Sequence, residues 1–148
     1  MIRNVGLVLF MLVVVSQAVL TQNKNDCSTT LSYENKNQVD PKPLLLSSVS
    51  GAVEDGQGVS IPDACIGIFT EDGQKLIAQA TSDENGKFAF SSVPAGKYRL
   101  IARYNPFCVA NIPIEIITKS QKGKLKRKKV VVHMKPSGID SCSYGGYK

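Results

Sequence analysis

Short runs in which apolar and polar residues alternate recur from Leu45 onward, separated by turn-forming residues about every ten positions. This alternation is typical of β-strands, and no window shows the periodicity of an amphipathic helix. Several short strands at this spacing indicate an all-β sandwich or barrel. The seven predicted strands are Leu45–Val53, Ala64–Thr70, Lys75–Thr81, Lys87–Phe90, Tyr98–Tyr104, Val109–Ile117 and Lys129–Lys135.

The alternation also assigns side chains to the core, because successive residues of a strand point to opposite faces. Burial of each large apolar side chain stabilises the fold by about 1.5–3 kcal/mol, so these faces could support a core. In the last strand the same rule turns His133 outward beside Lys135, as an ordinary surface histidine. The predicted inward residues are Ala64, Ile66, Ile68, Phe88, Phe90, Tyr98, Leu100, Ala102, Ala110, Ile112, Ile114, Ile116, Val130, Val132 and Met134.

The N-terminus, residues 1–18, has the order of a secretory signal peptide. Arg3 supplies a positive charge, Gly6–Val15 is an apolar run, and Ser16 and Ala18 are the small residues that a signal peptidase reads. We expect cleavage after Ala18 and a secreted, periplasmic or cell-surface protein. An uncleaved membrane anchor is the alternative, but spanning a bilayer takes about 20 apolar residues and Ser16 interrupts this run early.

The remaining chain divides into a leader, a domain and a tail. Residues 19–44 are polar and end in Pro41-Lys-Pro43, with too little apolar surface to offset the entropy of ordering them. We expect a flexible leader there, the sandwich over residues 45–136, and a short C-terminal tail over 137–148. No internal repeat suggests a second unit.

The four cysteines predict disulfides, since they form an even set in a chain expected in an oxidising compartment. If successive loops alternate between the two ends of the sandwich, Cys65, Cys108 and Cys142 share one end, and Cys27 could reach it from the leader. We favour Cys65–Cys108 with Cys27–Cys142, although three pairings are open. Alternation opposes this choice, because it turns Cys108 inward and Cys65 outward. Zinc binding is not expected, since no two cysteines are close in sequence.

The formal net charge is +6, and the excess lies in Lys119–Lys129. Such a run can bind nucleic acid, anionic glycans or anionic membranes, or it can be a solvated loop. The lack of interleaved aromatic residues and the expected export argue against nucleic acid. If successive loops alternate between the two ends of the sandwich, this basic run lies near Glu71–Asp72. Neutralisation of its positive charges by these two acids is then a simpler interpretation than a binding site. The possible polyanion contacts are Lys124, Lys126, Arg127, Lys128 and Lys129.

Three acidic pairs, Glu54–Asp55, Glu71–Asp72 and Asp83–Glu84, lie beside glycines at predicted strand ends. Paired carboxylates could indicate a glycosidase, which needs a cleft with a set carboxyl separation, or part of a calcium loop, whose later ligands are missing here. We predict that these acids shape turns. Asn85-Gly86 in particular predicts a tight type I′ hairpin turn, which needs positive φ at both central residues. No catalytic, metal or cofactor residue is expected.

Four motifs in this order resemble the carboxypeptidase regulatory-like domain. They are Val49-Ser-Gly-Ala-Val-Glu-Asp, Val59-Ser-Ile-Pro-Asp-Ala-Cys-Ile, Thr81-Ser-Asp-Glu-Asn-Gly-Lys-Phe-Ala-Phe and Val93-Pro-Ala-Gly-Lys-Tyr-Arg-Leu. The resemblance runs from Val49 to Phe107, and the two later strands complete the fold. It implies a seven-stranded Greek-key, prealbumin-like (transthyretin-like) sandwich without catalytic residues, sometimes credited with binding protein or carbohydrate.

Two related chemistries fit poorly. Transthyretin-like hydroxyisourate hydrolases use several histidines and an arginine, whereas this chain has His133 alone and an ending, Ser143–Lys148, without arginine. The lysine and asparagine of an isopeptide crosslink are missing from the first and last strands. We therefore expect a secreted non-enzymatic module that binds protein or carbohydrate at the cell surface, without a stable membrane anchor after signal cleavage. A structural component of an envelope or extracellular assembly is the alternative.

Overall fold

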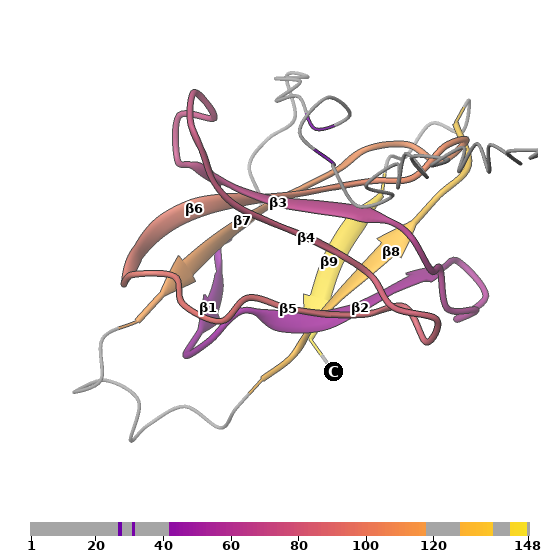
Figure 1. Cartoon of the computed structure of the whole chain (residues 1–148), viewed down its shortest axis with the longest axis horizontal. Coiled ribbons are helices and arrows are strands. Elements are labelled where there is room, and N and C mark those ends of the chain that lie inside the picture. Colours follow the sequence, from indigo (N-terminus) through magenta and orange to yellow (C-terminus); the bar gives the residue numbers. More distant parts are fainter. Residues whose placement is uncertain (1–26, 28–30, 32–41, 118–127, 138–142, 148) are drawn as a thin grey trace, which may run out of the picture.

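The computed structural model describes Cys27, Leu31 and residues 42–117, 128–137 and 143–147. Within this part, nine strands form two sheets that pack as a sandwich (Figure 1). The five-stranded sheet has the order β1-β7-β6-β3-β4 and the four-stranded sheet the order β5-β2-β8-β9. The strands are β1 Leu44–Leu46, β2 Ser50–Asp55, β3 Cys65–Thr70, β4 Leu76–Thr81, β5 Lys87–Ala89, β6 Gly96–Arg103, β7 Ala110–Ile116, β8 Val130–Met134 and β9 Tyr144–Tyr147.

The predicted all-β sandwich is confirmed, but the count of seven strands is wrong. The first predicted strand is two strands, because β1 pairs in parallel with β7 whereas β2 pairs with β5 and β8 in the other sheet. The ninth strand, β9, lies in the segment predicted as a tail and pairs antiparallel with β8. Its sequence, Tyr-Gly-Gly-Tyr, has no apolar alternation, so only its pairing with β8 identifies it as a strand.

The core between the sheets is the predicted one. The inward residues of β3, β7 and β8 are almost fully buried, and Ile66, Ile68, Val130, Val132 and Met134 have no exposed surface. Phe90 and Tyr98 are only partly buried at its margin. Period-two alternation therefore assigned the faces correctly, because each sheet has one face against the other sheet.

A second apolar cluster lies on the outer face of the five-stranded sheet. Cys27 and Leu31, from the segment predicted as a flexible leader, are buried there against Phe69 and Ile101. Gly67 provides the space, since a Cβ on it would lie 2.9 Å from Leu31 Cδ1. These two residues thus pack as part of the domain, while most of the predicted leader and the predicted signal peptide 1–18 lie outside the described residues.

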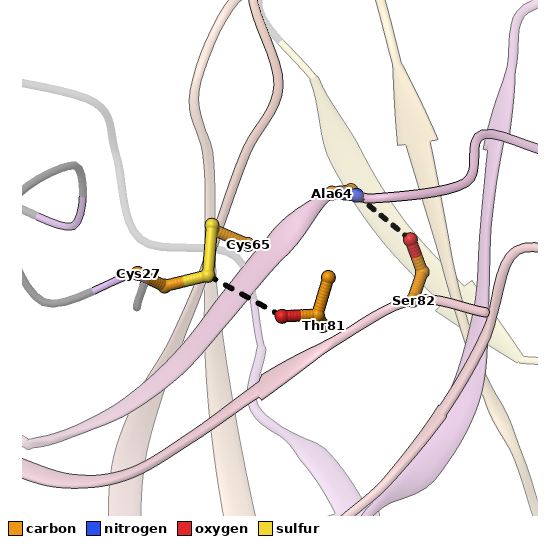
Figure 2. Close-up of a disulfide and its surroundings, with 5 residues drawn as sticks. All are labelled: Cys27, Ala64, Cys65, Thr81 and Ser82. Atoms are coloured by element: carbon orange, nitrogen blue, oxygen red, sulfur yellow. Dashed lines mark hydrogen bonds between the residues drawn. A yellow bond between two sulfur atoms is a disulfide. The ribbon is translucent and has the colours of Figure 1, made fainter. Parts of the chain in front are cut away.

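The preferred disulfide pairing is wrong. Cys27 bonds Cys65, with a Cα–Cα distance of 5.5 Å, and the Cys27 sulfur lies 3.5 Å from the Thr81 hydroxyl (Figure 2). Cys108 is also disulfide-bonded, and Cys142 lies outside the described residues. Cys65 is turned to the outer face, where Cys27 and Leu31 pack. The outward face of Cys65 on its strand therefore decided the pairing, and not the end of the sandwich at which the cysteines lie.

The aspartates of the three acidic pairs shape turns, whereas Glu54 lies within β2 and faces His133. Asp83 Oδ1 accepts hydrogen bonds from the backbone N–H groups of Asn85 (2.9 Å) and Lys87 (2.8 Å). Asp55 does the same for Gln57 and Val59.

The type I′ prediction is wrong, because Gly86 (φ 69°) but not Asn85 has positive φ. The Gly86 N–H bonds Asp83 O and the Asp83 N–H bonds Lys87 O, as in a type I turn followed by a glycine bulge.

Asp72 closes the turn between β3 and β4 in the same way. Its Oδ1 accepts hydrogen bonds from the Thr70 hydroxyl (2.5 Å) and the Gln74 N–H (3.0 Å). These bonds, the Thr70 contact first, hold the pKa of Asp72 below its usual value, since they favour the ionised carboxylate. The acid is therefore a negatively charged turn residue at neutral pH.

A buried serine fixes the connection into β3. Ser82 Oγ accepts a hydrogen bond from the Ala64 N–H (2.9 Å), drawn in Figure 2, and donates one to the Ile61 carbonyl (2.8 Å). The Ser82 N–H also donates to the Ala64 carbonyl (3.0 Å). Only 3% of Ser82 is exposed, so water cannot easily replace these bonds.

We predict that Ser82→Ala lowers the free energy of unfolding by roughly 2–4 kcal/mol, because it leaves a buried N–H and a buried carbonyl without their partner. The exposed Ser91 is the matched control, and Ser91→Ala should change stability by less than about 0.5 kcal/mol. Urea denaturation followed by circular dichroism measures both. Equal midpoints for the two variants would contradict the role assigned to Ser82.

Removal of the Cys27–Cys65 bond by a double alanine substitution should lower the free energy of unfolding by about 4 kcal/mol in the loop-entropy account, for a separation of 38 residues. Non-reducing peptide mapping of the wild type should recover a Cys27-containing peptide linked to a Cys65-containing peptide. A peptide that links Cys65 to Cys108 would overturn the assignment. Urea denaturation of the double variant checks the energy.

Candidate functional site

The outer face of the four-stranded sheet carries a stacked pair of rings at its β8–β9 side. His133 and Tyr144 are directly opposite in the register, so both point away from the core. Their ring centroids are 4.8 Å apart with an interplanar angle of 27°. The Nδ1 atom of His133 lies 3.4 Å from Oε1 of Glu54, its neighbour on β2. The outward position agrees with the alternation, and the stacking adds a specific orientation.

Two lysines lie over the tyrosine rings of β9. Lys135 Nζ is 5.2 Å from the centroid of Tyr144, and Lys128 Nζ is 4.2 Å from that of Tyr147. Both distances are within the range of cation–π attraction. We call His133, Lys135, Tyr144, Tyr147 and Lys128 the aromatic–basic surface. It runs around the edge strand β9, because Tyr144 and Tyr147 lie on opposite faces of that strand. Tyr144 is 51% exposed and Tyr147 is 40% exposed, so both rings remain open to a partner.

The first glycine between the two tyrosines, Gly145, positions β9. Gly145 faces the core side opposite Val132, and a Cβ on it would lie 2.6 Å from Cδ1 of Ile112. The strand can therefore lie close to the five-stranded sheet only with glycine at this position. Tyr147 then reaches across the edge of the sandwich, where its hydroxyl accepts a hydrogen bond from the Leu45 N–H of β1 (2.6 Å).

The structure includes only part of the predicted basic contact. Lys128 and Lys129 are described and exposed, and Lys128 belongs to the aromatic–basic surface. Lys124, Lys126 and Arg127 lie outside the described residues, so their predicted proximity to Glu71–Asp72 stays a prediction. Sequence reasoning missed Tyr144 and Tyr147. Two tyrosines that flank a Gly-Gly pair were a possible signal, but the sequence does not show that this segment pairs with β8.

The described residues contain no group of three or more His, Cys, Asp or Glu side chains that could hold a metal ion. None of their helices is long and apolar enough to span a membrane. The arrangement on β8 and β9 offers exposed aromatic faces, ammonium groups and one imidazole next to a carboxylate. Such a set can contact a ligand that combines apolar surface with negative charge.

Comparison with known proteins agrees with the motifs. Residues 48–124, more than half of the 148 in the sequence, match the model of the carboxypeptidase regulatory-like domain. The comparison with curated proteins gave no match. Among solved structures, the 5-hydroxyisourate hydrolase of Klebsiella pneumoniae is similar, with a TM-score of 0.48 and 19% identity over 69% of this chain and 99% of that one. The family match confirms the predicted resemblance, and the chain belongs to the carboxypeptidase regulatory-like domain family.

Proposed function

We propose that this chain is an exported, non-enzymatic module that binds an acidic carbohydrate of a cell surface or extracellular matrix. The observation that carries the proposal is the aromatic–basic surface, in which lysine ammonium groups lie beside two exposed tyrosine rings on an edge strand. The ligand would contact the surface with its sugar rings and its negative groups together.

The chemistry of the surface supports a carbohydrate. A tyrosine ring offers an apolar face to the C–H groups of a sugar and a hydroxyl to its polar edge. Among the described residues, Tyr144 and Tyr147 are two of the four large apolar or aromatic side chains left exposed. The neighbouring Lys128 and Lys135, in a chain of net charge +6, favour carboxylate or sulfate groups on that sugar.

The environment of His133 supports a binding role without catalysis. It is the only histidine of the sequence, and one of its ring faces lies against Tyr144. Its Nδ1 faces Glu54, and the role that we propose for the imidazole is to orient the tyrosine ring. Export is supported by the predicted signal peptide 1–18 and by the Cys27–Cys65 disulfide, a bond that persists mainly in oxidising compartments.

Binding to acidic polysaccharides tests the proposal. We expect polygalacturonate to retard the wild-type chain in affinity electrophoresis, and neutral dextran to leave it unretarded. Tyr144→Ala and Lys135→Ala should each weaken retention about tenfold, equivalent to about 1.4 kcal/mol. The loss for Lys135→Ala should shrink at high salt, because salt screens exposed charges.

The control is Lys75→Ala, which removes one exposed lysine in the turn before β4, far from β8 and β9 in the sheet order. It should bind as the wild type does. A wild-type chain that no acidic polysaccharide retards would refute the proposed function. An equal loss of retention for Lys75→Ala and Lys135→Ala would show that net charge alone explains the binding. It would refute a specific role of the aromatic–basic surface.

A further inference from the structure

In the described part of the chain the two sheets have four edge strands, and β4 is the longest of them. Strands β1 and β5 have three residues each, β9 has four, and β4 has six. The edge of β1 is also partly satisfied, because the Leu45 N–H donates to the Tyr147 hydroxyl. Proteins usually keep an edge strand short, charged or covered, since its unpaired backbone groups can pair with another chain. The length of β4 therefore sets it apart from the other three edges.

The side chains of β4 do not oppose such pairing. The sequence of the strand, Leu-Ile-Ala-Gln-Ala-Thr, contains no charged residue and no proline, which are the residues that usually protect an edge. Ile77 is 37% exposed, and Gln79 is exposed as well. A β-bulge at Ile77 interrupts only the start of the strand. Short segments without charge or proline are those that pair most readily with further strands.

The hydrogen bonds of Ser82 show which backbone groups of β4 point outward. The Ser82 N–H donates to the Ala64 carbonyl (3.0 Å), and the Ser82 carbonyl accepts from the Asp63 N–H (3.0 Å), so both groups point to the side of β3. In an antiparallel pair only every second residue bonds the neighbouring strand. The N–H and C=O groups of Thr81 and Gln79 therefore point away from β3 and toward solvent.

We propose that two copies of this chain associate through β4, antiparallel and around a two-fold axis at Gln79. Two edges exchange hydrogen bonds only in a register that sets outward-pointing residues opposite each other. With Gln79 opposite Gln79 of the second copy, Thr81 of each copy is opposite Ile77 of the other, and up to about six backbone hydrogen bonds form. The two five-stranded sheets then join into one continuous sheet, and each copy contributes the same surface to the contact.

Charge complementarity supports this register. Lys75 precedes β4, Asp83 follows it, and both residues are exposed. An axis at Gln79 puts Lys75 of each copy opposite Asp83 of the other, so that opposite charges lie at both ends of the pairing. Opposite charges across an antiparallel pair stabilise it, and like charges destabilise it. An axis at Ala78 or Ala80 would lose both charge pairs.

The contact is small, so the dimer should be weak. It involves one strand of six residues in each copy, whereas a standard interface has about 20–30 residues a side. We expect a Kd in the micromolar range and mostly monomer at lower concentrations. The carbohydrate binding proposed for the aromatic–basic surface can be measured on that monomer, because β9 is an edge of the other sheet.

Analytical ultracentrifugation tests the proposal on the full chain after removal of the predicted signal peptide. From low micromolar to several hundred micromolar, the wild type should shift from the monomer mass to twice that mass. Gln79→Lys should weaken association at least about tenfold, because it sets two positive charges opposite each other at the axis. Gln57→Lys is the matched control, since Gln57 is an exposed glutamine in the turn after β2, and it should associate as the wild type does. Both variants should keep the wild-type urea midpoint, because both side chains are exposed.

Cysteine crosslinking tests the register. Residues opposite each other in a hydrogen-bonded antiparallel pair have Cα atoms about 5.5 Å apart, a distance that a disulfide can span. Gln79→Cys should therefore give a disulfide-linked dimer on mild oxidation, and peptide mapping should find the two new cysteines joined to each other. Ile77→Cys should not, because the two copies of this residue lie about 13 Å apart along the paired strands.

Three outcomes would overturn the proposal. A wild type that stays monomeric over the whole concentration series would show that β4 does not associate. Association that Gln79→Lys leaves unchanged would mean that the copies meet through another surface. Equal crosslinking of Gln79→Cys and Ile77→Cys would contradict a two-fold axis at Gln79.

Discussion

The close approach of β2 and β8 is the contact on which the four-stranded sheet depends. Gly51 lies opposite Val130 in a parallel pair, and a Cβ on Gly51 would collide with the Val130 carbonyl oxygen. The absence of a side chain there lets β8 become an interior strand, with Val130, Val132 and Met134 in the core. The same pairing provides the edge to which β9 adds, so the tyrosines of the aromatic–basic surface depend on it too.

The edge strand β9 combines a structural role with the recognition role that we propose for it. Edge strands expose unpaired backbone groups, and proteins usually keep them short or cover them. Here β9 has four residues, and the Tyr147 hydroxyl ties it to the β1 backbone across the open side of the sandwich. Tyr144 points the other way, because residues three apart in a strand face opposite sides. One short strand thus closes the sandwich and presents an aromatic ring outward.

The two outer faces of the sandwich differ in what covers them. On the five-stranded sheet, Cys27 and Leu31 cover Phe69 and Ile101, and the Cys27–Cys65 bond holds this contact in place. On the four-stranded sheet, Tyr144 is half exposed, and it is next to charged side chains. This difference favours the β8–β9 side for a ligand, since apolar surface on the other face is already used for packing.

Local sequence determined the features that depend on a few neighbouring residues. Alternation in Ala110–Ile116 and Val130–Met134 gave the buried faces and the outward position of His133, because the side-chain period of a strand is two. Aspartates beside glycines gave the turns, since a short carboxylate bonds the backbone next to it. The four ordered motifs gave the family.

The tertiary structure alone decided what depends on residues far apart in the chain. It placed β1 and β2 in different sheets, added β9 to β8 and joined Cys27 to Cys65. No local pattern in Tyr-Gly-Gly-Tyr predicts a strand, and alternation on β8 cannot reveal a ring on β9. The stacking of His133 on Tyr144 arises only where strands from distant segments meet. The alternation along one strand determines which way a side chain points. The residue that it contacts depends on strand pairing and on the packing of the two sheets.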